Sequence, residues 1–411
     1  MRICMVFDDD YPWDVRVERI GRALTGGGHE VFLACRNRKR SAVLAETVHT
    51  LQVRRMAPYR ALPAAVDRQL MFPAFFSPRW LRHIKRVIRE DGCDAVLVRD
   101  LPLAMAGVNA GQRLGLPVAI DMAENYPAAL RAFQMHDGRR LLDLVVRNPR
   151  AADRLERTVA RRADHIMVVC DEMRGKIIGL GADPARVTVV GNTPDLERFG
   201  DVSPPEEVAS RYADRFVLLY VGEVNPYRGL GTAVDALPAI RERIPNVALA
   251  VVGRGSGIDD LARRAEELGV TGHLDLVGFL PHEDLAGFIA RSEICLIPHL
   301  RTEHIDTTLP NKLFEYMALG RPVLTTDAVP LERVVTETGC GATYRSGDPA
   351  DMARAVLDLA DPRRREEMGS RGHEAVRGRY NWARDTEILL DVFRSEPMTR
   401  REPQNPRMNI T

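Results

Sequence analysis

Hydrophobic residues in the first half of the chain alternate between short continuous runs and helical spacing. Residues 2–7, RICMVF, form an unbroken apolar run, which is typical of a parallel strand covered on both faces. Apolar residues at helical spacing follow in RVERIGRAL (16–24), and the glycines of GGGHEVFLACR (26–36) end this helix before a second strand. The same strand–helix rhythm recurs at DAVLVRD (94–100), LPVAIDMAEN (116–125) and ADHIMVVCD (163–171).

A change of composition divides the chain. Residues 200–214 combine proline with charge, which is typical of a linker. The rhythm then restarts, with apolar runs at FVLLYVGEV (216–224), VALAVVGRGSG (247–257), HLDLVGFL (273–280), EICLIPHL (293–300) and RPVLTTD (321–327). Two alternating halves of similar size predict an α/β chain of two doubly wound, Rossmann-like domains that face a central cleft, where ligands bind.

We place the first domain at residues 1–200 and the second at 201–380. We expect a C-terminal helix at 381–396 to pack back on the first domain. Residues 397–411 have the composition of a disordered tail.

Composition narrows the classes of function. The 411 residues are 45% hydrophobic and 28% charged, as in a globular protein. A net charge of +1 argues against a nucleic-acid binder, which is normally strongly basic. No apolar run approaches the ~20 residues of a membrane helix, and the first strand begins without a signal peptide. Cys4, Cys35, Cys170 and Cys295 lie in strand-like runs without metal-ligand spacing, so we expect core residues in a reducing cytoplasm.

The segment LPNKLFEYMALGRPV (309–323) is predicted to form a buried helix that leads into a strand. Its first turn nevertheless carries Asn311, Lys312 and Glu315 on one face. One interpretation is an ion pair between Lys312 and Glu315 within the helix, worth a few tenths of a kcal/mol. The other is a ligand with phosphate and hydroxyl groups.

Two loops after strands of the second half offer related chemistry. In YVGEVNPYRGL (220–230), Arg228 and Gly229 precede a helix, where free N–H groups and a guanidinium can bind an anion; a surface arginine is the alternative. Gly253 follows another strand. Its loop is either a tight connection from a strand to a helix or a loop whose backbone approaches a nucleotide. Because a helix start disfavours a cation unless an anion is bound, Arg228 and Lys312 are candidates to clamp a diphosphate, with Glu315 on a ribose.

Residues 57–90 interleave aromatic and basic side chains. Such a pattern can mark a peripheral membrane-binding surface, here through residues 60–89 with Trp80 at the interface. The alternative is a pair of ordinary helices that pack on the first sheet, with solvated arginines.

Seven segments match a known family, and together they span nearly the whole chain: DVRVERIGRALTGGGHEV (14–31), DMAENYP (121–127), ADHIMVVCDEM (163–173), VGNTPDLERF (190–199), GEVNPYRGL (222–230), VVGRGSG (251–257) and LPNKLFEYMALGRPV (309–323). On these segments the chain resembles the family-4 retaining glycosyltransferases of GT-B architecture, in the subgroup with a PNKLFEYMA-type motif. The resemblance implies an N-terminal acceptor-binding domain and a C-terminal domain that binds a nucleotide sugar.

The resemblance also implies roles for residues. Arg228 corresponds to the basic residue of the diphosphate loop, Glu315 to the second glutamate of the E-x7-E signature on the ribose, and Lys312 to a further phosphate ligand. The backbone around Phe279 and Leu280 would meet the base. The other residues expected at the donor site are Gly222, Gly229, Gly253, Thr307, Thr308, Leu309, Pro310 and Asn311.

Three positions depart from the family pattern. Thr307 stands where the signature has its first glutamate, Glu223 where many members have a second diphosphate-binding arginine, and Ala123 where many have a histidine. These departures leave the donor sugar open. Glu124, after a strand of the first domain, is the candidate for positioning sugar or acceptor.

The resulting hypothesis is an enzyme that transfers a sugar from a nucleotide diphosphate, a UDP-sugar, to an acceptor hydroxyl with retention of anomeric configuration. Arg228 and Lys312 would stabilise the leaving diphosphate, so we expect no metal and no other cofactor; Asp8–Asp10 is the sequence that argues for a metal. The acceptor would be a glycan, a lipid-linked saccharide or a small molecule, without nucleic acid. The alternatives are a GT-B-like epimerase or phosphorylase and a non-catalytic nucleotide-sugar-binding protein.

Overall fold

The computed structural model describes residues 1–12, 14–59, 61, 63, 75, 77–137, 148–198 and 202–399. Contacts divide the chain into an N-terminal unit, Met1–Gly191 with Asp385–Thr411, and a C-terminal unit, Asn192–Arg384. The division precedes residue 200 because the intervening segment bonds within the C-terminal unit. Asn192 Nδ2 donates to the carbonyl of Leu309 at 3.5 Å, and the N–H of Trp382 donates to that of Pro194 at 2.9 Å.

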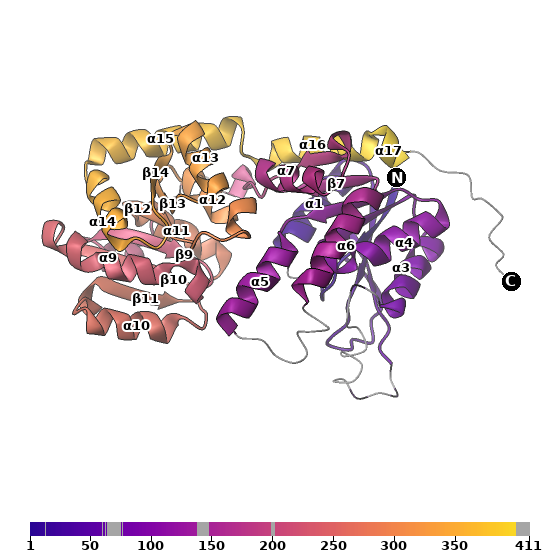
Figure 1. The fold of residues 1–411 in the computed structure, drawn as a ribbon, viewed down its shortest axis with the longest axis horizontal. Coiled ribbons are helices and arrows are strands. Elements are labelled where there is room, and N and C mark those ends of the chain that lie inside the picture. The colour runs from indigo at the N-terminus through magenta and orange to yellow at the C-terminus, as the bar shows by residue number, and fades with distance from the viewer. Residues whose placement is uncertain are drawn as a thin grey trace. The chain divides into compact units, whose positions relative to one another are not determined.

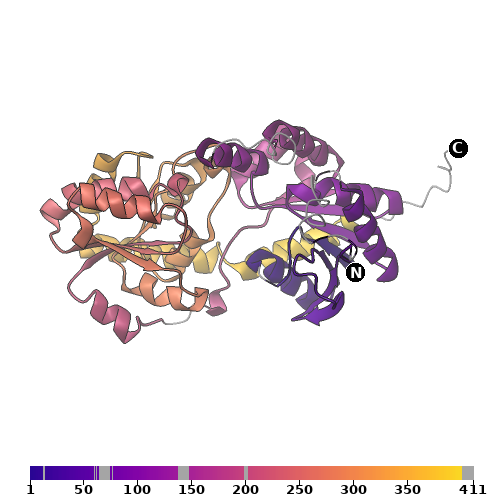
Figure 2. The ribbon, with the colours of Figure 1, turned by 90° about the horizontal axis from the view of Figure 1, so that it is seen from below.

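The described residues of the N-terminal unit form an eight-stranded sheet in the order β3-β4-β2-β1-β5-β6-β7-β8. Its strands are β1 (Arg2–Val6), β2 (Glu30–Cys35), β3 (Ala45–Val48), β4 (Leu51–Arg55), β5 (Ala95–Arg99), β6 (Val118–Met122), β7 (His165–Val168) and β8 (Val187–Val189). The predicted runs are confirmed as parallel strands with helices on both sides (Figures 1 and 2). The antiparallel edge pair β3/β4 was not predicted.

The helices of this unit are α1 (Val15–Gly26), α3 (Pro78–Glu90), α4 (Ala104–Leu114), α5 (Tyr126–Asp137), α6 (Pro149–Arg162) and α7 (Asp171–Gly179). The carboxylate of Asp14 caps α1 by accepting from the N–H of Val17 at 2.8 Å, which satisfies one of the unpaired donors at a helix start. Ile3 to Val6 of β1 are fully buried, as a strand covered on both faces requires.

A buried ion network ties α1 to the sheet. Arg16 Nη2 and Nε donate to the two carboxylate oxygens of Asp121 at 2.7 and 2.9 Å, and Arg16 also donates to the carbonyls of Val190 and Gly191. Asp121 is fully buried, and a second guanidinium, that of Arg99, lies 3.7 Å away. Burial alone would raise the pKa of Asp121, but the two arginines outweigh it and hold that pKa below its ordinary value.

The end of the chain returns to the N-terminal unit. In α16 (Trp382–Arg394), Leu390 packs so closely on Gly27 that a Cβ there would lie 2.3 Å from Leu390 Cδ2. The prediction of a disordered tail from residue 397 is wrong for 397–399, because α17 (Glu396–Thr399) buries Met398 completely (Figure 1). The remainder of the predicted tail, 400–411, lies outside the described residues.

The described residues of the C-terminal unit form a six-stranded, all-parallel sheet in the order β11-β10-β9-β12-β13-β14. The strands are β9 (Phe216–Val221), β10 (Val247–Val252), β11 (Leu274–Gly278), β12 (Ile294–Ile297), β13 (Val323–Thr326) and β14 (Gly341–Tyr344). The helices are α8 (Glu206–Arg211), α9 (Leu230–Arg243), α10 (Ile258–Glu267), α11 (Leu285–Arg291), α12 (Asn311–Ala318), α13 (Val329–Thr338), α14 (Pro349–Asp358) and α15 (Pro362–Gly378).

The predicted linker at 200–214 is only partly extended. Residues 206–211 form α8, and Tyr212 behind it is buried, with its hydroxyl donating to Asp275 at 2.7 Å. Arg211 pairs with the same carboxylate. A charged segment therefore becomes part of the C-terminal unit, because its one aromatic residue has a place in the core.

The prediction of an aromatic interface at residues 60–89 is wrong for the aromatic residues that the structure describes. Trp80 is completely buried and Phe75 is 4% exposed, since the apolar face of α3 packs on the sheet. Arg82 and Arg86 are exposed on the other face of α3. Residues 60, 62, 64–74 and 76 of this segment lie outside the described residues.

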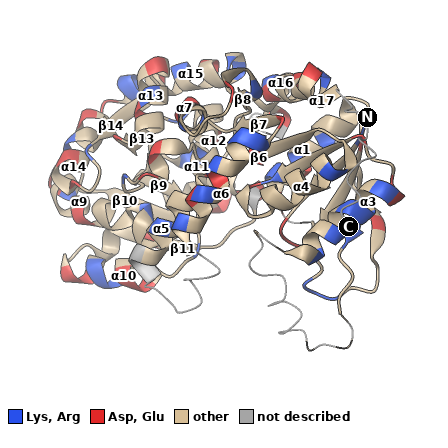
Figure 3. Cartoon of the chain, turned by 45° about the vertical axis from the view of Figure 1, so that its right-hand side comes forward, with Lys and Arg blue, Asp and Glu red and all other residues tan. Residues whose placement is uncertain are grey.

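In the described part of the chain, every helix is too short or too polar to cross a membrane. Acidic and basic residues alternate over the helices of both units in Figure 3, without a continuous basic face in that view. All six cysteines are buried, as expected for small core residues.

We expect Asp121→Asn to destabilise the N-terminal unit by about 3–5 kcal/mol, because it leaves the buried charge of Arg16 without its counter-ion. Urea unfolding measures this difference. The matched control is Asp153→Asn, which removes an exposed partner of Arg131 and should cost less than about 1 kcal/mol. Equal effects of the two variants would contradict a buried network that depends on Asp121.

Candidate functional site

The candidate site lies at the carboxyl edge of the C-terminal sheet, between β9 and β12. The chain runs from β9 outward to β10 and β11 on one side, and through β12 to β13 and β14 on the other. The loops after β9 and β12 therefore leave in opposite directions, although the two strands are hydrogen-bonded neighbours. Parallel sheets bind ligands at such a reversal of strand order, because the diverging loops leave backbone groups uncovered there.

The loop after β9 brings the start of α9 against the end of β12. Gly229, the residue before α9, has φ +72°, and a Cβ on it would lie 1.8 Å from the carbonyl oxygen of Pro298. Only glycine fits both this backbone conformation and this close approach. The first N–H groups of a 14-residue helix are thereby held at the strand ends.

Two neighbouring loops touch through their glycines. Gly253, after β10, has φ +159°, and a Cβ on it would lie 1.8 Å from the carbonyl oxygen of Gly222, after β9. The N–H of Gly222 donates to Val252, and that of Gly253 to Gly278. The glycines thus continue the pairing of the strands beyond their ends, and neither has a side chain of its own to cover the backbone.

Lys312, in the first turn of α12, reaches toward β9. Its ammonium lies 4.1 Å from the centre of the Tyr220 ring and beside Gly222, and Tyr316 of the same helix accepts from the N–H of Val221 at 3.1 Å. Burial, and then the charge of Arg228, lower the pKa of Lys312 well below its ordinary value, although Glu315 acts in the opposite direction. The positive charge therefore points to the strand ends of the predicted anion site.

Arg228 ends the short helix η6 (Pro226–Arg228), directly before Gly229. Its Nη2 lies 3.7 Å from Glu223 Oε2, in a pair whose side chains are 25% and 55% exposed. An ion pair with this exposure contributes little free energy and constrains its two side chains weakly. Glu223, which stands where the family resemblance implies a second arginine, thus lies beside Arg228.

Glu315, one turn into α12, is only 7% exposed, whereas Asn311 at the start of the helix is exposed. Before α12, Thr307 ends η9 (Ile305–Thr307) with its hydroxyl donating to Glu303 at 2.8 Å, and Leu309 is buried. The segment from Thr307 through Thr308 and Pro310 thus leads from β12 into α12 along the same sheet edge.

Phe279 follows β11, on the outer side of the same edge. It is 62% exposed, and the guanidinium of Arg254 lies 4.6 Å from its ring centre; Leu280 follows it. An exposed aromatic ring beside the glycine loop of β10 is a surface on which a planar group can stack.

Glu124 lies in the N-terminal unit, so it belongs to another part of the fold than Arg228 and Lys312. It follows β6 and is exposed. Burial, together with the charge of Glu124, raises the pKa of Asp100 to about 7, although Arg99 acts against this shift.

Asp8–Asp10, the sequence considered as a metal site, is engaged with the loop after β2. Asp8 and Asp9 pair with Arg36 and Arg38, and Asp10 accepts from the N–H of Arg38 at 2.7 Å. In the described part of the chain, no three His, Cys, Asp or Glu residues gather as metal ligands would.

Sequence reasoning missed His299, two residues after β12. It is 1% exposed, and neither ring nitrogen has a hydrogen-bond partner among the described residues. Its place at the end of β12 was readable in EICLIPHL, but a histidine in an apolar run is ordinarily a core residue. Only the strand order makes this position a ligand site.

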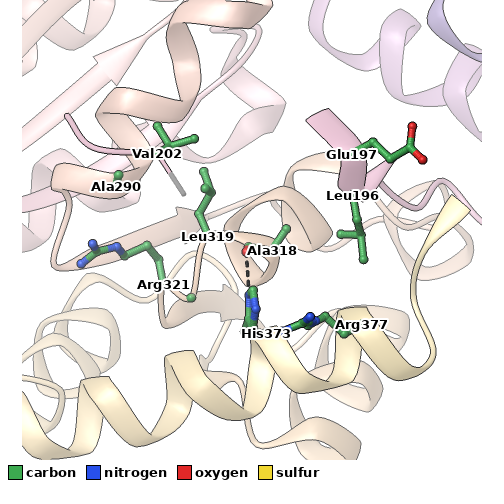
Figure 4. Close-up of a pocket in the computed structure, with 10 residues that line it drawn as sticks. Leu196, Glu197, Val202, Ala290, Ala318, Leu319, Arg321, His373 and Arg377 are labelled. Atoms are coloured by element: carbon green, nitrogen blue, oxygen red, sulfur yellow. Dashed lines mark hydrogen bonds between the residues drawn. The ribbon is translucent and has the colours of Figure 1, made fainter. Parts of the chain in front are cut away.

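A pocket of about 640 Å³ lies elsewhere in the C-terminal unit (Figure 4). It is lined by the end of α12, Arg321 and one face of α15, where His373 Nδ1 bonds to the carbonyl of Ala318 at 2.8 Å. Because Gly320 and Arg321 precede β13, this pocket lies at the opposite edge of the sheet from Lys312.

Comparison with known proteins agrees with this architecture. Residues 14–193 match the family model "Glycosyl transferase 4-like domain", and residues 215–361 match "Glycosyl transferases group 1". A glycosyltransferase domain model thus matches each half of the chain, which is the arrangement of the GT-B fold. Arg228, Lys312 and Glu315 fall in the second of these domains and Glu124 in the first.

Curated relatives of this GT-B chain have diverse names. D-inositol 3-phosphate glycosyltransferase 2 of Catenulispora acidiphila is 29% identical over 251 residues, which are 58% of this chain and 57% of that protein. The GDP-mannose-dependent alpha-(1-6)-phosphatidylinositol monomannoside mannosyltransferase of Mycolicibacterium smegmatis is 28% identical over 243 residues, 57% and 64% of the two chains. The match thus spans little more than half the length of these relatives.

Solved structures resemble the GT-B chain over almost its whole length. Sucrose-phosphate synthase from Thermosynechococcus elongatus has a TM-score of 0.75 at 18% identity and covers 96% of this chain and 98% of that one. Anabaena Alr3699/HepE in complex with UDP-glucose has a TM-score of 0.71 at 16% identity, with 96% and 99% covered. At these identities the likeness establishes the fold, and it confirms the predicted GT-B architecture.

We expect Gly229→Ala to destabilise the C-terminal unit, because the new Cβ meets the carbonyl of Pro298 in a backbone conformation that L residues rarely adopt. Gly231→Ala is the matched control. Gly231 lies two residues further in the first turn of α9 with nothing near its Cβ position, and alanine there should stabilise by about 0.5–1 kcal/mol. Thermal unfolding measures both; a neutral Gly229→Ala would contradict the close approach.

Proposed function

We propose that this GT-B chain transfers a sugar from a nucleotide diphosphate donor, a UDP-sugar, to an acceptor hydroxyl with retention of anomeric configuration. The observation that carries the proposal is the convergence of Arg228, Lys312 and the start of α9 on the reversal of strand order. A diphosphate bound there would be held by backbone N–H groups and two cations.

The electrostatics of the site favour an anion. Burial disfavours the charged form of Lys312, and the charge of Arg228 adds to this cost. A bound diphosphate would offset both effects. As the bond between the anomeric carbon and the phosphate oxygen breaks, the leaving diphosphate gains negative charge, so preorganised cations stabilise the transition state more than the bound substrate.

The other proposed contacts to the nucleotide sugar come mainly from residues along the same edge of the sheet. Glu315, one turn from Lys312, would accept hydrogen bonds from the ribose hydroxyls, and the backbone at Phe279 and Leu280 would meet the base. Glu124 of the N-terminal unit would position the sugar or the acceptor. Arg228 and Lys312 would supply the positive charge that a metal ion supplies in other transferases.

Uridine is the proposed base. A fold neighbour, Alr3699/HepE, is described with UDP-glucose, whereas one relative is named for GDP-mannose. Retention follows from the resemblance to family 4. The acceptor class is a hydroxyl of a glycan, a lipid-linked saccharide or a small molecule.

The test is turnover of UDP- and GDP-sugars with a panel of hydroxyl acceptors, with and without EDTA. We expect release of UDP, a glycoside whose anomeric proton in NMR shows the donor's configuration, and no effect of EDTA. Epimerised donor without glycoside would replace the proposal by an epimerase, and nucleotide-sugar binding without turnover by a non-catalytic binder. Inverted product would overturn retention.

We expect Arg228→Ala to lower kcat by a factor on the order of 10²–10³, the scale of one lost electrostatic donor to a developing charge. Arg243→Ala, on an exposed arginine in the last turn of α9, is the control and should leave kcat unchanged. Steady-state kinetics measures kcat and KM separately. A raised KM with an intact kcat would make Arg228 a uniform binder and contradict the mechanism.

We expect Glu315→Gln to weaken nucleotide affinity by about 1–3 kcal/mol, because a hydrogen bond to a charged group is lost while the side chain keeps its size. Calorimetric titration with UDP measures the change. Glu332→Gln, on the exposed start of α13, serves as control. Unchanged affinity in Glu315→Gln would exclude the ribose role.

A further inference from the structure

His299 is a buried polar side chain without hydrogen bonds at a site otherwise built for a ligand. Its backbone is held, since its carbonyl accepts from the hydroxyl of Thr326 at 2.9 Å. Its ring is 1% exposed, and both nitrogens lack partners among the described residues. A buried donor or acceptor that makes no hydrogen bond costs free energy, so such a group in a folded protein requires an explanation.

The ring lies where the two halves of the sheet diverge. His299 follows Pro298, whose carbonyl is the group that Gly229 approaches at the start of α9. Three side chains act on its charge: Lys312 from α12 and Arg228 from the loop after β9, which belong to the proposed diphosphate site, and His304 after β12.

The surrounding charges keep the imidazole neutral. Burial lowers the pKa of His299 well below its ordinary value, and the charges of Lys312, Arg228 and His304 add to this. The titratable and charged groups on the segments around this strand end are Lys312 and Glu315 on α12, Arg228 and Glu223 after β9, Arg301, Glu303, His304 and Asp306 after β12, and Asp327 after β13. A neutral imidazole has one N–H donor and one acceptor nitrogen.

We propose that His299 is a direct ligand of the nucleotide-sugar donor and donates an imidazole N–H to a diphosphate oxygen between Arg228 and Lys312. This inference rests on the proposed function and deepens it, because it adds a residue of this chain to the donor site. A phosphoryl oxygen is the acceptor that this N–H lacks, and its negative charge offsets the three positive neighbours.

The proposal also predicts proton uptake. The negative charge of the bound diphosphate favours the imidazolium form and raises the pKa of His299 from its depressed value. Binding should therefore be coupled to proton uptake that increases as the pH falls. A sugar diphosphate is the appropriate probe, because a terminal phosphate itself titrates near pH 6.

The experiment is calorimetric titration of the full chain with UDP-glucose and with GDP-mannose, for wild type and His299→Leu. Leucine has a similar volume and removes both unpartnered nitrogens, so we expect an unchanged or higher melting temperature without ligand. We expect at least tenfold weaker binding of whichever probe the wild type binds. Wild type should take up more protons on binding at pH 6 than at pH 8, as measured in two buffers of different ionisation enthalpy, and His299→Leu should show no such difference.

His373→Leu is the matched control, because His373 is hydrogen-bonded at the opposite sheet edge. It should lower the melting temperature and leave affinity unchanged. Should His299→Leu fail to fold, His299→Asn, which keeps an N–H donor, should bind without the proton uptake. Equal affinity of wild type and His299→Leu would overturn this inference alone, whereas binding of neither probe to wild type would overturn the proposed function.

Discussion

The hydrogen-bonded pairing of β9 with β12 is the constraint on which the site depends. Leu218 pairs with Ile294 and Leu219 with Cys295, and from this pair the chain continues outward in both directions. Parallel strands must all end at the same edge, so the loops after β9 and β12 separate exactly where their strands are adjacent. The start of α9, the end of β12 and the first turn of α12 meet there as a consequence of topology.

The meeting of these loops also concentrates positive charge, which costs free energy of folding. The burial of helix α12 offsets this cost. The charge of Arg228 opposes the charged form of Lys312, and the charges of both oppose the charged form of His299. The rest of α12 is deeply buried, with Leu313, Phe314, Tyr316 and Met317 at most 1% exposed. Apolar burial on this scale stabilises a helix that carries an unfavourable charge in its first turn. The first turn of α12 can therefore carry a binding residue without loss of the helix, because the side chains of the following turns belong to the core.

The N-terminal unit has a reversal of strand order as well, between β1 and β5, but its charges are paired. Arg99 lies 2.5 Å from Asp100, and Arg16 grips Asp121 with two hydrogen bonds at the ends of neighbouring strands. A closed network of this kind holds the sheet edge together and leaves little charge for a ligand. The two units therefore use one topology differently: a buried, closed charge network in the first, and in the second two cations, of which Arg228 has only an exposed pair with Glu223. This contrast is why the donor site is assigned to the second unit.

Much of the fold was readable from the chain alone. Continuous apolar runs such as 216–221 and 247–252 predicted buried parallel strands, because a strand covered on both faces has no polar side to show. Arg228 and Lys312 were identified because each stands at a helix start after a strand, and local spacing reveals that position. The half-polar edge strands β3 and β4 carried no comparable signal.

Other features depended on contacts between residues far apart in the chain. Trp80 lies in an arginine-rich stretch, and only the sheet beneath α3 buries it completely. Tyr212 draws a charged segment into the core through Asp275, 63 residues away. Composition and period determined the parallel α/β domains and the cations at helix starts, since both are local properties. Tertiary structure alone decided that the His299 ring is buried with neither nitrogen hydrogen-bonded to the described residues, because that depends on how β9, β12 and α12 surround one ring.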